Sequence, residues 1–146
     1  MFQGTYRHTI DAKGRVAIPA KLRKVISPDA ENTLILTRGS NSCISVYPRD
    51  IWNNKIVAKL KTLNEYNQND NRVLRYLSHN ADEEEMDGQS RIIVPKFLLE
   101  HARIKDEILI MGTIEKIEFW DPEVYAEYER SSAVAYDDLI EQVLKS

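Results

Sequence analysis

The chain contains one short pattern twice. Asp11-Ala12-Lys13-Gly14-Arg15 and Asp87-Gly88-Gln89-Ser90-Arg91 each place an acid four residues before an arginine, and a β-branched run and a proline follow, Pro19 or Pro95. The two acids, the two arginines and the two prolines are each 76 residues apart. Such an internal repeat constrains the fold more than any single element does, because repeated units usually pack against each other.

Each pattern predicts a tight turn between two short strands. An aspartate at the start can accept hydrogen bonds from the backbone amides that follow it, and Gly14 can adopt a positive φ without strain. Residues 6–10 and 15–18 alternate well enough to be the two strands, so we expect a hairpin there. Pro19 ends the second strand and can open a short helix.

The remaining elements repeat in the same order. Strands are expected at 33–37, 43–47, 91–94, 108–111 and 116–120, of which 33–37 and 108–111 read as buried, with residues 84–86 leading into the second turn. Between the repeats, Trp52, Ile56, Leu60 and Leu63 form one helical stripe, and a shorter helix ends near residue 80. Asp121-Pro122-Glu123 is a strong helix start, and the last segment is an amphipathic helix.

These elements predict an α+β fold, mainly β, in four parts. The parts are a first repeat at 5–50, a helical insert at 51–80, a second repeat at 81–124 and a C-terminal helical tail at 125–146. A repeat of about 45 residues is too small to bury an adequate core alone. We therefore expect the two repeats to interlock into one core, as a pseudo-dimer within one chain.

Charge is distributed unevenly along the chain. The net charge is −3, but residues 1–28 contain six lysines and arginines against one acid. In contrast, residues 82–91 contain five acids against one base, and residues 121–146 contain seven against two. This asymmetry indicates a basic face for an anionic partner near the first turn.

Several function classes are disfavoured by what the sequence lacks. No apolar run is long enough to span a membrane, the N-terminus does not resemble a signal peptide, and the single cysteine, Cys43, indicates a reducing cytosol. No catalytic motif is present, and His8, His79 and His101 lack metal-ligand spacing, so we expect no enzyme activity, metal, cofactor or small-molecule substrate. The acidic residues 82–85 favour a solvated or subunit-contacting edge over a Mg²⁺ site.

The two turns, their prolines and the N-terminal Phe2-Gln3-Gly4-Thr5-Tyr6 resemble the MraZ family of bacterial regulators, built from two SpoVT/AbrB-type repeats. The resemblance covers nearly the whole chain. It implies a double swapped-hairpin β-barrel, ring-like homo-oligomers of many subunits, and a cytoplasmic, nucleoid-associated protein. It also implies regulation of the division and cell-wall gene cluster through repeated short boxes in promoter DNA.

The first turn is the better candidate for DNA contact, because Ser90 and Gln89 replace Gly14 and Lys13 in the second turn, which has acidic surroundings. A two-stranded ribbon can enter the major groove, where Arg15, and also Arg7, can bind guanine O6 and N7. The predicted phosphate contacts are Lys13, His8, Lys21, Arg23 and Lys24. Asp11 is expected to hold the turn and direct Arg15; Gly14, Asp87 and Arg91 are expected to shape the turns.

Alternative functions remain open from sequence. The acidic second repeat and tail are also compatible with an antitoxin-like protein-interaction module that docks a basic partner, and less so with a metal-dependent hydrolase. One turn offers about two base-reading side chains at ~1–3 kcal/mol each, too little for the roughly 10⁻⁸ M affinity of specific regulators. This shortfall favours an oligomer. The apolar stripe of the tail can cover either its own body or a neighbouring subunit.

Overall fold

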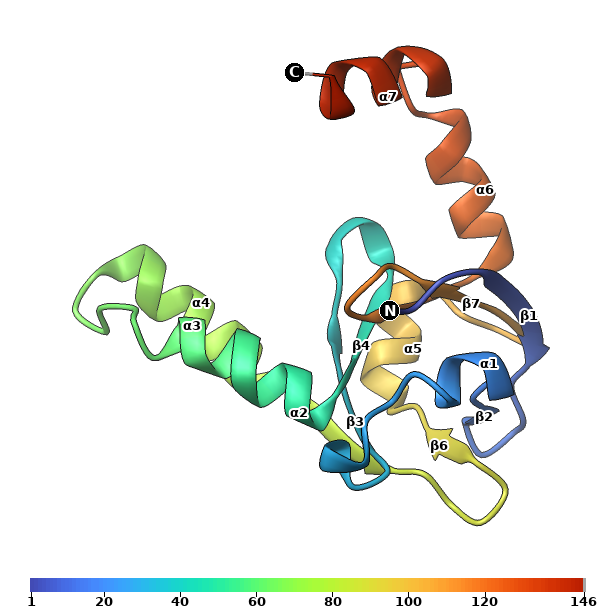
Figure 1. Ribbon diagram of the computed structural model, residues 1–146, viewed down its shortest axis with the longest axis horizontal. Helices are drawn as coiled ribbons and strands as arrows, with labels where there is room; N and C mark the ends of the chain where they lie inside the picture. The colour runs from blue at the N-terminus through green and yellow to red at the C-terminus, as the bar shows by residue number, and fades with distance from the viewer. Residues whose placement is uncertain (146) are drawn as a thin grey trace.

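Strands of one repeat pair mainly with strands of the other (Figure 1). The computed structural model describes residues 1–145, in which the first repeat supplies β1 (Thr5–Thr9), β2 (Arg15–Ala17), β3 (Thr33–Arg38) and β4 (Ile44–Pro48). The second repeat supplies β5 (Asp82–Glu85), β6 (Arg91–Ile93), β7 (Glu107–Gly112) and β8 (Ile117–Trp120). Six strands form an antiparallel sheet in the order β1-β7-β8-β4-β3-β5, and β2 and β6 form a separate two-stranded ribbon, called the ribbon below.

The pairing register has an internal two-fold symmetry. In the ribbon, Arg15 lies opposite Ile93 while the equivalent Arg91 lies opposite Ala17. At the sheet edges, β1 of the first repeat pairs with β7 of the second, and the equivalent strand β5 of the second repeat pairs with β3 of the first. The prediction of two interlocked repeats in an α+β fold is confirmed.

The local hairpin expected around the first turn is not formed. β1 joins the six-stranded sheet and β2 joins the ribbon, so the hairpin is swapped between the repeats. The reason is burial: Val16 and Ile92 face each other across the ribbon and are 0% and 1% exposed. The six-stranded sheet is not closed into a barrel, since no ladder within residues 1–145 joins its edge strands β1 and β5.

One hydrophobic core serves both repeats. Its fully buried side chains come from the ribbon, the central strands and the two helices that follow the ribbon strands. They include Val16, Leu22, Leu34, Leu36, Ile44, Ile92, Leu98, Ile108, Ile110, Ile117 and Phe119. Neither repeat could bury these residues alone, which explains why the chain folds as one body.

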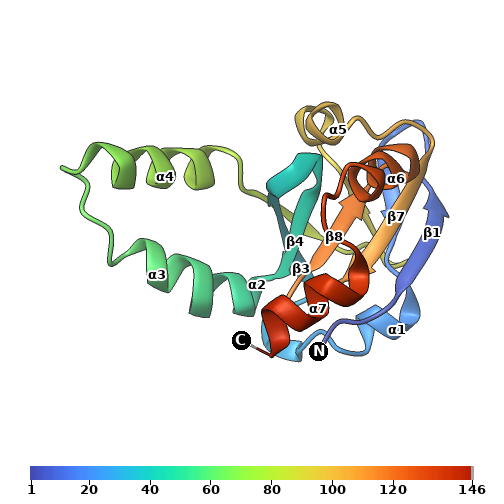
Figure 2. The same ribbon diagram turned by 90° about the horizontal axis from the view of Figure 1, so that it is seen from above.

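A short helix follows each ribbon strand, and both helices pack against the core. Helix α1 (Ala20–Arg23) begins after Pro19 and α5 (Lys96–Ala102) begins after Pro95. Figure 2 shows α1 and α5 on opposite sides of the strands. Two 3₁₀ turns, η1 (Pro28–Ala30) and η2 (Ser40–Ser42), flank β3.

A helical arm projects from the body between β4 and β5 (Figures 1 and 2). Its first limb runs continuously through α2 (Arg49–Ile51), η3 (Trp52–Val57) and α3 (Ala58–Leu60), and its second limb is α4 (Gln68–His79). The middle segment η3 is a π-helix, which has more residues per turn than the α-helix expected there. We call α2, η3, α3 and α4 together the arm.

Two more helices extend the chain beyond β8. Helix α6 (Pro122–Arg130) has the predicted Asp121 cap, whose Oδ2 accepts hydrogen bonds from the amides of Glu123 (3.0 Å) and Val124 (3.2 Å). The Trp120 ring packs edge-on against Tyr125, at 5.0 Å between centroids. Helix α7 (Tyr136–Leu144) follows. Within residues 1–145, no helix is long and apolar enough to cross a membrane.

Candidate nucleic-acid interface

The first turn is built around the carboxylate of Asp11. Its Oδ1 accepts hydrogen bonds from the backbone amides of Lys13 (3.0 Å) and Arg15 (2.8 Å), and its Oδ2 accepts one from Arg15 Nε (2.6 Å). Hydrogen bonding from the Arg15 amide, helped by the Arg15 side chain, holds the pKa of Asp11 below its usual value. One charged group therefore fixes both the turn and the direction of the Arg15 side chain.

The second turn repeats this geometry. Asp87 Oδ1 accepts from the amides of Gln89 (2.8 Å) and Arg91 (2.9 Å), and Oδ2 accepts from Arg91 Nε (3.0 Å). The pKa of Asp87 is also lowered, chiefly by the Arg91 amide. The different residues between acid and base, Gly88-Gln89-Ser90, do not change the backbone hydrogen bonds.

Each turn is held in place by the other repeat. The Gly14 carbonyl accepts from the Val94 amide (2.8 Å), and the Ser90 carbonyl accepts from the Ile18 amide (2.9 Å). Gly14 and Ser90 occupy equivalent positions with φ of 80° and 59°. Gly14 is buried, and a Cβ there would lie 3.0 Å from the Val94 carbonyl oxygen. Both turns consequently lie at one end of the molecule, in the lower right of Figure 1.

The outward face of the ribbon carries two arginines. Successive residues of a strand point to opposite faces, so Arg15, Ala17, Arg91 and Ile93 share the face opposite the buried Val16. The side chains of Arg15 and Arg91 are 31% and 29% exposed. Sequence reasoning assigned Arg91 to the turn alone, although its equivalence to Arg15 was a signal that both belong to one surface.

These two arginines keep their terminal amino groups available. Within residues 1–145, the intramolecular hydrogen bonds of the Arg15 and Arg91 side chains involve only Nε. The Nη1 and Nη2 groups of each are the pair that binds guanine O6 and N7 in a bidentate contact. The carboxylates thus orient the two guanidinium groups without occupying the edge that would read a base.

Three lysines near the first turn have no acidic partner among residues 1–145. Lys13 lies at the tip of the turn, Lys21 lies on α1 and Lys24 caps it; all are exposed and none forms an ion pair within residues 1–145. We call Lys13, Lys21 and Lys24 the basic cluster. Arg23 is used differently, because its Nε donates to the Ile18 carbonyl (3.0 Å) and its Nη1 to Ser90 Oγ (2.9 Å).

Arg7 and His8 lie in the six-stranded sheet, outside the ribbon. The Arg7 guanidinium donates to Glu107 Oε2 through Nε (2.9 Å) and also through Nη2. Arg7 therefore faces a carboxylate and cannot offer its bidentate edge without breaking this ion pair. His8 points to the opposite side of β1 and is half-buried.

Other chemistry-bearing groups do not assemble into a site. Within residues 1–145, no group of three His, Cys, Asp or Glu side chains is placed to hold a metal ion. Cys43 is buried, and burial raises the pKa of its thiol to about 12. The acidic residues of β5 lie on a sheet edge, where Glu83 is within 3.7 Å of Arg49.

Swapped repeats in one chain, with oriented arginines on a shared ribbon and lysines beside it, define a class of DNA-binding transcriptional regulators. Comparison with known proteins agrees. The family model described as "MraZ protein, putative antitoxin-like" matches residues 1–76 and 77–142, once for each repeat.

Curated relatives give the same result over nearly the whole chain. Three are named "Transcriptional regulator MraZ": proteins of Caldanaerobacter subterraneus (38% identical over 98% of this chain and 96% of its own), Lactobacillus delbrueckii (40% over 98% and 96%) and Heliobacterium modesticaldum (34% over 99% and 97%). The chain belongs to the MraZ family. It is a DNA-binding transcriptional regulator and not an enzyme.

Proposed function

We propose that this protein reads repeated short boxes in the promoter of the division and cell-wall gene cluster through the outward face of the ribbon. The observation that carries the proposal is the orientation of Arg15 and Arg91 by Asp11 and Asp87 on one surface. A two-stranded ribbon is narrow enough for the major groove. With two arginines related by symmetry, one subunit can contact two guanines.

The basic cluster would bind the phosphate backbone beside the groove. Lys13, Lys21 and Lys24 are exposed and uncompensated, so an ammonium at each position can displace counterions from DNA. Such contacts add affinity without sequence information. The equivalent positions in the second repeat are Gln89, Phe97 and Glu100, so phosphate binding belongs to the first repeat.

We propose further that the protein acts as a ring-like homo-oligomer. Two bidentate contacts supply ~1–3 kcal/mol of discrimination each, which is little for a specific regulator. Several ribbons binding consecutive boxes gain affinity through their high effective concentration. Because it binds DNA, we propose that the protein associates with the nucleoid in the cytoplasm. The position of a fluorescent fusion in the cell tests this.

The test is fluorescence anisotropy with the protein's own upstream promoter DNA and a scrambled sequence, across a salt series. We expect Arg15→Ala and Arg91→Ala each to weaken promoter binding by ~1–3 kcal/mol per subunit and to reduce the preference over scrambled DNA. Lys21→Ala should weaken binding to promoter DNA and to scrambled DNA equally. It should also lower the salt dependence of binding, as the slope of log K against log salt, by about one for each phosphate that the variant no longer binds. Lys105→Ala, an exposed lysine outside the proposed interface, is the control.

Two results would contradict the proposal. Equal binding of promoter and scrambled DNA by the wild type would leave only nonspecific electrostatics. An Arg15→Ala variant that keeps full promoter preference would remove the ribbon as reader. A stable complex with a basic protein that survives Arg15→Ala would then favour the antitoxin-like interaction module instead.

A further inference from the structure

A pocket of about 410 Å³ lies between the end of α1, the loop after it and the second turn. We call it the turn pocket, and its walls include Arg23, Ile26, Pro28, Asn32, Met86 and Ser90. Pockets of this size bind small molecules in many proteins, usually through an apolar lining and a few polar groups. The turn pocket fits that description, because three of these side chains are apolar and the other three can donate hydrogen bonds.

The cation of the turn pocket is held in one orientation. Arg23 Nε donates to the Ile18 carbonyl (3.0 Å), and Nη1 donates to Ser90 Oγ (2.9 Å). Within residues 1–145, Nη2 has no intramolecular hydrogen bond and the guanidinium forms no ion pair. A guanidinium that is fixed through two nitrogens while the third is free is preorganised to bind an acceptor.

The acid of the turn pocket does not neutralise this cation. Asp87 also lines the pocket, but its Oδ1 accepts from two backbone amides and its Oδ2 accepts from Arg91 Nε. One positioned cation favours a ligand with a single negative charge, and a carboxylate can accept two parallel hydrogen bonds from a guanidinium. The apolar part of the wall favours a carboxylate that is attached to an apolar body.

The two repeats differ at the residues that make this pocket. Arg23 corresponds to Leu99 in the second repeat, at the offset of 76 residues, and Asn32 corresponds to Asp106, since their carbonyls accept equivalent backbone hydrogen bonds. Leu99 packs against the core, and its Cδ1 would lie 3.9 Å from a Cβ added at Gly14. An apolar residue therefore satisfies the fold at this position, so the fold alone does not require the positioned arginine.

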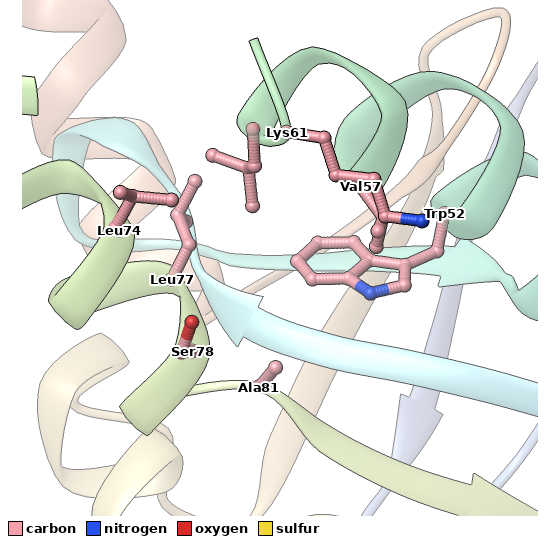
Figure 3. Close-up of a pocket in the computed structure, with 8 residues that line it drawn as sticks. Trp52, Val57, Lys61, Leu74, Leu77, Ser78 and Ala81 are labelled. Atoms are coloured by element: carbon pink, nitrogen blue, oxygen red, sulfur yellow. The ribbon is translucent and has the colours of Figure 1, made fainter. Parts of the chain in front are cut away.

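The turn pocket also differs from the cavity between the two limbs of the arm. Figure 3 shows that cavity, with Leu74 and Leu77 of α4 turned toward Trp52 and Val57 of the first limb. Its one charged lining residue, Lys61, is exposed and makes no side-chain hydrogen bond within residues 1–145. The charge that could select a ligand is thus fixed in the turn pocket and unfixed in the arm.

We propose that the turn pocket binds a small carboxylate with an apolar body. The carboxylate would bind Arg23 and Ser90, and the apolar body would pack against Ile26 and Met86. A ligand bound there neutralises Arg23, a predicted phosphate contact, and adjoins the turn that orients Arg91. It should therefore weaken DNA binding. Binding of the carboxylate does not depend on DNA, whereas its effect on DNA binding rests on the proposed function.

Saturation-transfer NMR with benzoate tests the pocket on the full chain without DNA. We expect saturable transfer to the benzoate ring, and much weaker transfer to benzyl alcohol, a neutral molecule of similar size. Arg23→Leu, which copies the residue at position 99, should raise the dissociation constant of benzoate about tenfold or more. Lys105→Gln removes one positive charge outside the turn pocket and should bind benzoate as the wild type does.

A second variant keeps the shape of the pocket and changes its charge. Asn32→Asp is isosteric, and the equivalent position in the second repeat is already an aspartate, so we expect the variant to fold. The added negative charge should repel the benzoate carboxylate and weaken its binding. Melting temperatures equal to that of the wild type would show that a loss of binding comes from the pocket and not from unfolding.

Three results would overturn the proposal. If benzyl alcohol binds as tightly as benzoate, or if Arg23→Leu keeps the wild-type affinity, Arg23 does not select an anion. If inorganic phosphate displaces benzoate at equal concentration, the apolar wall is irrelevant and the DNA backbone is the natural occupant. If no saturable transfer to benzoate occurs, the pocket does not bind small carboxylates.

Fluorescence anisotropy with promoter DNA measures the consequence separately. At constant ionic strength, replacing chloride by benzoate should lower the promoter affinity of the wild type and leave that of Arg23→Leu unchanged. By linkage, promoter DNA should lower the affinity for benzoate by the same factor. Benzoate binding without an effect on promoter affinity would contradict the coupling. A wild type that binds benzoate but shows no promoter preference would contradict the proposed function and support the pocket.

Discussion

At the scale of single residues, Asp11 links backbone shape to side-chain direction. The same carboxylate closes the turn and holds Arg15 Nε, so the arginine is positioned before any DNA is present. Its lowered pKa keeps it charged well below neutral pH. Preorganisation of this kind reduces the entropy cost of binding.

Gly14 is where backbone conformation should limit the sequence most. We expect Gly14→Ala to destabilise the protein by about 1 kcal/mol or more, because φ is 80° and the added Cβ would crowd the Val94 carbonyl. The measurement is the urea unfolding midpoint. Gly88→Ala is the matched control in the second turn: nothing lies within 4 Å of its Cβ, so stability should stay level or rise slightly. Equal destabilisation of both variants would contradict this account.

Sequence reasoning identified the repeat, the basic residues and the contact between Asp11 and Arg15, but not the partners of Arg7 and Arg23. The Arg7–Glu107 ion pair joins residues 100 apart and the Arg23–Ser90 hydrogen bond joins residues 67 apart, so no local pattern marks either. Both arginines were predicted as DNA contacts, and that role stays a prediction. Arg91 could have been placed, because the equal spacing of the two motifs implies the symmetry that puts it beside Arg15.

At the scale of elements, the strands were predictable to within one or two residues, but their partners were not. Alternation shows which side chains face a core and says nothing about which strand supplies the hydrogen bonds. The arm shows a similar limit. The predicted stripe had the α-helical period, whereas Val57 lines the cavity five residues after Trp52 because η3 is a π-helix.

The edge strand β5 should make stability depend on pH. Burial, then the hydrogen bond and charge of Asp82, raise the pKa of Glu84 to about 7. Between its ordinary value near 4.5 and 7, the folded state binds a proton that the unfolded state has released, so this group lowers stability as pH rises. We expect Glu84→Gln to raise the free energy of unfolding relative to wild type above pH 7 and to have little effect below pH 4.

Chemical denaturation at several pH values measures this difference. Glu85→Gln, an exposed neighbour in the same strand, is the control for removal of one negative charge. A Glu84→Gln variant whose stability tracks wild type in parallel at all pH values would show that Glu84 titrates normally.

At the scale of the whole molecule, contact between copies in the proposed oligomer can pair opposite charges, because residues 1–28 are basic and residues 121–146 are acidic. Salt screens exposed charges, and the Debye length falls from about 10 Å at 0.1 M to about 3 Å at 1 M. We therefore expect the assembly mass to decrease between these salt concentrations, measured by sedimentation without DNA. The melting temperature of the body should change little, since its core is apolar. A mass that rises with salt would mean that the contact is purely hydrophobic.

The ribbon has a consequence for protein copy number. If the two strands of such a ribbon came from separate chains, dilution would separate them. Here β2 and β6 belong to one polypeptide, joined through residues 18–90, so they stay paired at any concentration. A cell with few copies of this chain would still hold intact ribbons, the proposed DNA-reading units. Abundance would decide only how many of them gather on one promoter.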